Sequence, residues 1–69
     1  MPAQFQEFPK PSNVDAQTYA QDVANARAAF GVMTDTLNAH NGLEGNIGVS
    51  EQYWVKKNEY RAYLSKYGA

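Results

Sequence analysis

Residues 13–40 read NVDAQTYAQDVANARAAFGVMTDTLNAH, and they contain the clearest helical pattern in the chain. Its larger apolar residues and two alanines follow one another at alternating spacings of three and four: Ala16, Tyr19, Val23, Ala26, Phe30, Met33 and Leu37. An unbroken seven-residue repeat lines one face of an α-helix. Asn13 is a suitable N-cap, and Asp15 would place negative charge in the first turn, where the helix dipole favours it. The pattern predicts a helix over about residues 13–39.

A second face of small residues lies beside this repeat, formed by Ala20, Ala24, Ala28 and Gly31. Alanine is simply the best helix former, so the alanines need no further explanation. Glycine inside a helix costs about 1 kcal/mol relative to alanine. Gly31 therefore predicts a compensating feature, either a close backbone contact or a bend.

Residues 50–67, SEQYWVKKNEYRAYLSKY, predict a second and shorter helix. Ser50 is a suitable N-cap, and Gly68 a suitable stop. One face carries Tyr53, Tyr60, Leu64 and Tyr67, with Lys57 in the gap and with Trp54 and Tyr63 at its flanks. An amphipathic helix of this kind needs another surface to cover its aromatic face.

The intervening stretch, NGLEGNIGVS at residues 41–50, has glycines at 42, 45 and 48. Spaced glycines raise the question of a phosphate-binding loop, but such loops need a preceding strand or a following Gly-Lys-Ser/Thr. This stretch follows one predicted helix and precedes another. His40 and its neighbours are suited to the C-terminal end of the first helix. The stretch is predicted to be a hinge over residues 40–49, with Leu43, Ile47 and Val49 covering the end of an antiparallel helical hairpin.

The first 12 residues contain all three prolines and two phenylalanines, Phe5 and Phe8. Proline restricts its own backbone and pushes the preceding residue toward an extended conformation. The prediction is an extended arm over residues 1–12, with a disordered tail as the alternative, before a hairpin over residues 13–69. The shorter helix would cover about two-thirds of the longer one, so either the arm or another subunit would cover Ala16 and Tyr19.

Composition argues against several functional classes. The chain of 69 residues has no cysteine, one histidine and a net charge of −1. It therefore offers no disulfide or thiolate metal site, and His40 has no partner identifiable from spacing. We predict no catalytic, cofactor-binding or metal-binding residues. The N-terminus lacks the pattern of a secretion signal, and no apolar window is long enough to cross a membrane. The expected location is the cytoplasm, or a particle assembled there, with no membrane association.

Interface-type aromatic residues dominate what remains, and small helical hairpins seldom bury enough surface alone. An all-α, non-enzymatic structural or assembly protein is therefore predicted, oligomeric or bound to protein subunits. Its layout resembles that of small accessory proteins of bacteriophage particles, although no motif is shared. The predicted partner-binding residues are Phe5, Phe8, Tyr19, Phe30, Trp54, Tyr60, Tyr63 and Tyr67.

Two alternatives remain open at this point. One is a small regulator or inhibitor that binds a host protein. The other is a nucleic-acid-binding hairpin, in which aromatic rings stack on bases and cations hold phosphates. Its candidate contacts are Lys56, Lys57, Arg61 and Lys66. With Glu51 and Glu59 the second helix carries only +2, and the rest of the chain carries −3, so nucleic-acid binding is the less favoured alternative.

Overall fold

The first helix, α1, spans Ala16–Ala39 in the computed structural model, which describes residues 4–68. Its N-cap is Asp15, whose backbone is extended and whose carboxylate accepts a hydrogen bond from the Thr18 N–H at 3.3 Å. The prediction that Asn13 caps the helix is wrong. Residues 12–14 instead form a turn, in which the Val14 N–H donates to the Pro11 carbonyl at 3.3 Å.

The end of α1 is closed by the left-handed backbone of Asn41, with φ of 60°. The Gly42 N–H reaches back to the Leu37 carbonyl at 2.6 Å, and the Asn41 N–H donates to the Asn38 carbonyl at 3.2 Å. This pair of bonds is the Schellman arrangement, which satisfies helix carbonyls that would otherwise lack partners. His40 occupies the C-cap, as predicted, and its Nδ1 lies 2.8 Å from the Thr36 carbonyl oxygen.

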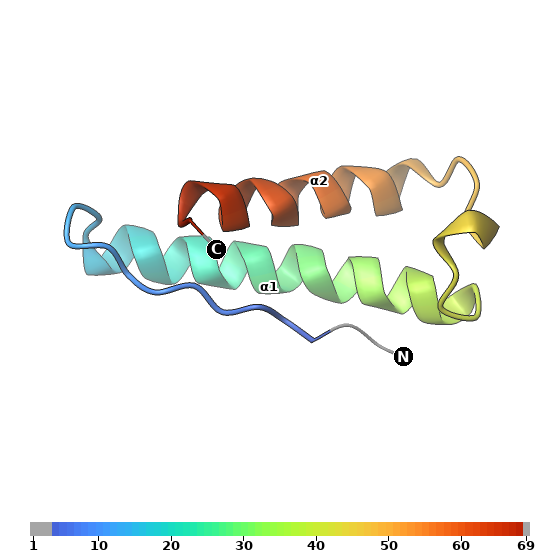
Figure 1. Ribbon diagram of the computed structural model, residues 1–69, viewed down its shortest axis with the longest axis horizontal. Helices are drawn as coiled ribbons and strands as arrows, with labels where there is room; N and C mark the ends of the chain where they lie inside the picture. The colour runs from blue at the N-terminus through green and yellow to red at the C-terminus, as the bar shows by residue number, and fades with distance from the viewer. Residues whose placement is uncertain (1–3, 69) are drawn as a thin grey trace.

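A short 3₁₀ helix, η1 (Glu44–Asn46), follows in the hinge, and the second α-helix, α2, spans Glu51–Lys66. Ser50 lies at the N-cap as predicted, although its side chain makes no capping hydrogen bond. Gly68 follows the helix with φ of 71°, a backbone conformation that favours glycine. Within residues 4–68 all regular structure is helical, and α1 and α2 pack antiparallel (Figure 1), which confirms the predicted all-α hairpin.

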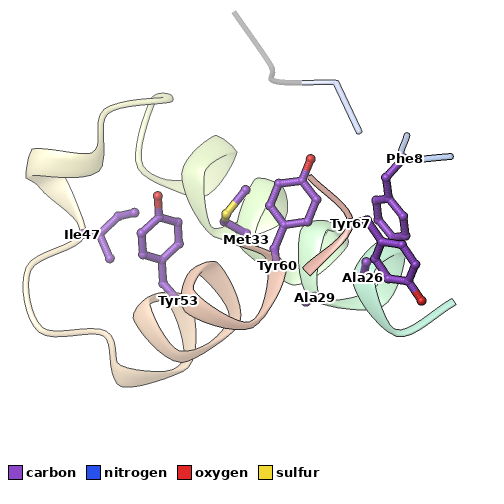
Figure 2. Close-up of a cluster of buried hydrophobic side chains, with 8 residues drawn as sticks. All are labelled: Phe8, Ala26, Ala29, Met33, Ile47, Tyr53, Tyr60 and Tyr67. Carbon is purple, nitrogen blue, oxygen red and sulfur yellow. The ribbon is translucent and has the colours of Figure 1, made fainter. Parts of the chain in front are cut away.

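The buried side chains follow the interface from the hinge to the open end of the hairpin (Figure 2). Both predicted helix faces contribute to this core, which consists of Phe8, Ala26, Ala29, Met33, Ile47, Tyr53, Tyr60 and Tyr67. Helix α2 and its C-cap supply a buried tyrosine every seventh residue, and the buried side chains of α1 are two alanines and a methionine. Ala29, which lies between the predicted repeat positions, is also buried at 2% exposure. The interface is therefore wider than the seven-residue repeat indicates.

The described N-terminal segment, which precedes α1 in the chain, runs alongside α1 in the opposite direction (Figure 1). Residues 4–11 contain no helix or strand, which agrees with the predicted extended arm. Phe8 is only 3% exposed, so the described part of the arm packs on the hairpin of its own chain. Pro2, which belongs to the predicted arm, lies outside the described residues.

Three side-chain predictions need correction or refinement. A Cβ built at Gly31 would meet no atom within 4 Å, so this glycine makes no close backbone contact in the described chain. Of the three residues expected to cover the hinge end, only Ile47 is buried. Leu43 lies just before η1 and Val49 in the turn that follows it, and both side chains are exposed. No helix within residues 4–68 is long and apolar enough to cross a membrane.

Candidate interaction site

The arm groove, as we name it here, is formed by four aromatic residues of the two helices. Tyr19 and Phe30 come from α1, and Tyr60 and Tyr67 from α2 and its C-cap. The Phe5 ring packs against both Phe30 and Tyr60, with centroid distances of 5.7 Å and 5.8 Å. The Phe8 ring stacks on Tyr67 at 4.5 Å and meets Tyr19 edge-on at 6.1 Å. Both arm rings therefore bridge the two helices.

Two tyrosine hydroxyls of the groove bind the backbone of the arm. The Gln6 N–H donates to Tyr60 Oη at 2.9 Å, and Tyr19 Oη donates to the Phe8 carbonyl at 2.6 Å. An extended segment has no internal partners for its peptide groups, so these bonds replace water at the covered positions. The groove thus recognises an extended backbone as well as two rings.

A charged contact accompanies the rings. Arg27 Nη2 lies 3.0 Å from Glu7 Oε1, and its guanidinium stands 4.4 Å from the Phe5 ring centroid. Because both charged side chains are more than half exposed, the ion pair adds little to stability. An open cleft of about 310 Å³ lies beside it, lined by Phe5, Glu7, Phe8, Pro9, Tyr19 and Val23.

At the open end of the hairpin, Asp22 of α1 accepts hydrogen bonds from the side chains of Lys66 and Tyr67. Tyr67 Oη lies 2.6 Å away and Lys66 Nζ 2.8 Å away. The Lys66 hydrogen bond, followed by that of Tyr67, lowers the pKa of the Asp22 carboxyl. The same carboxylate, together with burial, raises the pKa of Tyr67 to about 12.

The hinge end repeats this arrangement around Glu44 of η1. Tyr53 Oη donates to Glu44 at 2.7 Å, and Lys57 forms an ion pair with it. The Lys57 and Tyr53 hydrogen bonds lower the pKa of Glu44. Burial and the hydrogen bond to Glu44 raise the pKa of Tyr53 to about 12. At each end of the hairpin, one carboxylate therefore stabilises the register of α2 against the rest of the chain.

A second candidate surface, the hinge-end patch, consists of Leu43, Val49, Val55 and the partly buried Trp54. The three aliphatic residues are 59%, 96% and 46% exposed, respectively. Trp54 Nε1 donates to the Gly48 carbonyl at 2.8 Å, which fixes the indole against the hinge. The left-handed backbone of Gly48, with φ of 68°, forms the turn that this bond closes.

The predicted partner-binding residues have different environments. Phe8, Tyr60 and Tyr67 are buried by their own chain, whereas Phe5, Tyr19, Phe30, Trp54 and Tyr63 are partly buried and pack against the core. Sequence reasoning missed Glu7, Asp22, Arg27 and Glu44 as polar partners in these contacts. Their contacts join segments up to 45 residues apart, and local spacing carries no signal for that.

The candidate nucleic-acid contacts are mostly engaged within the chain. Lys56 pairs with Glu59, Lys57 with Glu44 and Lys66 with Asp22. Among these four cations, Arg61 alone has no ion pair within residues 4–68. A cation that is already paired with a carboxylate neutralises a phosphate less effectively. It therefore releases few counterions and adds little to nucleic-acid affinity.

Compared with known proteins, the chain matches no family model, no curated protein and no solved structure. Within the described residues, no three His, Asp or Glu side chains lie close enough together to hold a metal ion. The arm groove and the hinge-end patch are therefore interpreted from their own geometry.

Proposed function

We propose that this chain is a non-enzymatic structural or assembly protein, which docks onto subunits of a larger complex such as a bacteriophage particle. The observation that supports it best is the hinge-end patch. Single exposed apolar residues are ordinary on protein surfaces, but here three exposed aliphatic residues and a tryptophan all belong to the hinge or to the first five residues of α2. Tryptophan is also among the residues most enriched at the positions that dominate binding energy.

The size of the chain adds to this argument. A chain of 69 residues buries only about 60% of the surface it exposes when unfolded. Its core alone rarely supplies more than about 3–5 kcal/mol, and the chain has no cysteine for a disulfide. Binding a partner to the folded state adds stability that grows with the logarithm of the partner concentration.

Light scattering coupled to size exclusion tests the proposal, with circular dichroism on the same fractions over a dilution series. We expect an oligomer whose helicity falls on dilution, because self-association would stabilise the folded chain. A fully helical monomer at every concentration would contradict self-assembly. A poorly helical monomer would direct the search to a different partner protein.

Two variants connect the result to the patch. Val49→Ser with Val55→Ser removes exposed apolar surface without disturbing the buried core, and should weaken association while leaving the monomer helical. Ala62→Ser is the matched control, since Ala62 is exposed on α2 away from the hinge. Equal association by the paired valine variant and the control would remove the hinge-end patch as the docking surface.

A further inference from the structure

We propose that the arm groove also binds residues 4–8 of a second copy, so that neighbouring chains exchange arms within an assembly. This inference rests on the proposed function, because only an assembly holds copies close enough for exchange to compete. Exchange of an identical element is a low-cost route to association, since the arm makes the same interactions with a neighbouring chain as with its own.

The groove itself specifies its occupant. It provides separate contacts for two rings three residues apart, a donor for the carbonyl of Phe8, an acceptor for the N–H of Gln6, and a cation opposite Glu7. Residues 4–8 of another copy present the same five groups in the same order. No other segment of the chain has two phenylalanines at this spacing.

The connection between arm and helix can open by breaking one backbone hydrogen bond and releasing the packing of the partly buried Val14. Residues 9–15 join Phe8 to α1, and the reversal of direction is held by the Val14 N–H to Pro11 carbonyl bond. Pro9 and Pro11 favour extended backbone in the residues that precede them. Fully extended, seven residues reach about 23 Å, enough to carry the arm from one hairpin to a neighbour.

The concentration of neighbouring chains determines whether a groove binds its own arm or the arm of another copy. A short connection holds the arm at an effective concentration on the order of millimolar beside its own groove. A dilute chain therefore keeps its own arm, whereas copies packed in an assembly meet comparable concentrations. Exchange would then link each subunit to its neighbour without any new contact type.

Cysteine pairs test the exchange, because the chain has no cysteine of its own. Glu7→Cys is introduced in one full-length chain and Arg27→Cys in another, and the mixture is treated with a short bismaleimide. Both positions are exposed, so folding should be preserved. The mixture of Glu7→Cys and Asp35→Cys is the matched control, since Asp35 is exposed and belongs to neither the groove nor the hinge.

Arm exchange predicts that, at about 1 mM, the mixture of Glu7→Cys and Arg27→Cys (the 7–27 pair) yields several-fold more cross-linked heterodimer than the control mixture of Glu7→Cys and Asp35→Cys. The excess should disappear on dilution, and should fall when Phe5→Ala, at the partly buried ring of the arm, is added to the Glu7→Cys chain. Helicity is measured on the same samples. A 7–27 yield equal to the control, in samples that light scattering shows to be associated, would overturn arm exchange and leave the proposed function intact. Samples that remain monomeric and fully helical at every concentration would contradict both, whereas poorly helical monomers would overturn arm exchange alone.

Discussion

The Phe8 ring stacks on the Tyr67 ring, with centroids 4.5 Å apart and planes 18° from parallel. This contact joins the arm to the C-terminal end of α2, across almost the full length of the chain. Phe8 is 3% exposed and Tyr67 is 7% exposed, so the pair closes the open end of the core. The hairpin is in this sense completed by a segment that is not helical.

Phe8→Ala should therefore be among the most destabilising single changes. Removing a buried phenylalanine costs about 3–5 kcal/mol, comparable with the whole stability expected of so small a core. Phe5→Ala, at a partly buried ring of the same arm, should cost clearly less. Urea titrations followed by circular dichroism compare the two. Equal small shifts in midpoint would mean that the arm is not packed on the hairpin.

Acid should weaken the register of α2. Asp22 and Glu44 have lowered pKa values in the folded chain, so their stabilising contribution is present above the unfolded values of about 4. It is lost as the pH falls through the folded values. The urea midpoint should drop between pH 5 and pH 3, and Asp22→Asn with Glu44→Gln should show a smaller drop. An identical drop in that double variant would assign acid sensitivity to other carboxyl groups.

Raising the pH should ionise the tyrosines that donate hydrogen bonds to Asp22 and Glu44. Tyr53 and Tyr67 have pKa values raised to about 12, so the neutral phenols are favoured in the folded chain. Their contribution is complete below the ordinary tyrosine pKa of about 10 and is lost as the pH rises through 12. Absorbance titration of tyrosinate should show two hydroxyls ionising late in the folded protein. In urea all five should ionise near the ordinary value, and a folded titration identical to the one in urea would contradict these two contacts.

The helix start offers a direct test between sequence and structure. The Asp15 carboxylate caps the Thr18 N–H, whereas Asn13 lies in the preceding turn. Asp15→Ala should cost about 0.5–2 kcal/mol, typical of a lost N-cap. Asn13→Ala should change the free energy of unfolding by less than about 0.5 kcal/mol, as for an ordinary surface position. The reverse ranking in thermal or urea unfolding would restore the sequence-based assignment.

How far the sequence predicts this molecule depends on the distance over which each feature acts. The seven-residue repeat ending at Leu37 and the tyrosine spacing on α2 act within single helices, and both faces lie where the pattern places them except at Ala16, which is exposed. The destination of the arm could not be derived in this way, because Phe5 and Phe8 would suit a groove of the same chain or of another.

The polar contacts were beyond prediction for a related reason. Asp22 meets Lys66 and Tyr67 only because the hinge sets the register between the two helices. A single residue more in the hinge would rotate these partners apart. The predicted burial of Leu43 and Val49 is wrong because apolar spacing does not encode the irregular backbone of the hinge, in which both residues lie outside η1.

Gly31 and Gly48 should respond in opposite ways to alanine. Gly31 lies in helical backbone, and a Cβ there would meet no atom within 4 Å, so Gly31→Ala should stabilise the chain by about 0.5–1 kcal/mol. Gly48 has φ of 68°, which strains any residue with a Cβ, so Gly48→Ala should destabilise it by about 1–2 kcal/mol. Both variants are compared with the parent in urea. A loss of stability at Gly31 that deepens with protein concentration would show that a second chain approaches this face, and that the glycine is kept for that contact.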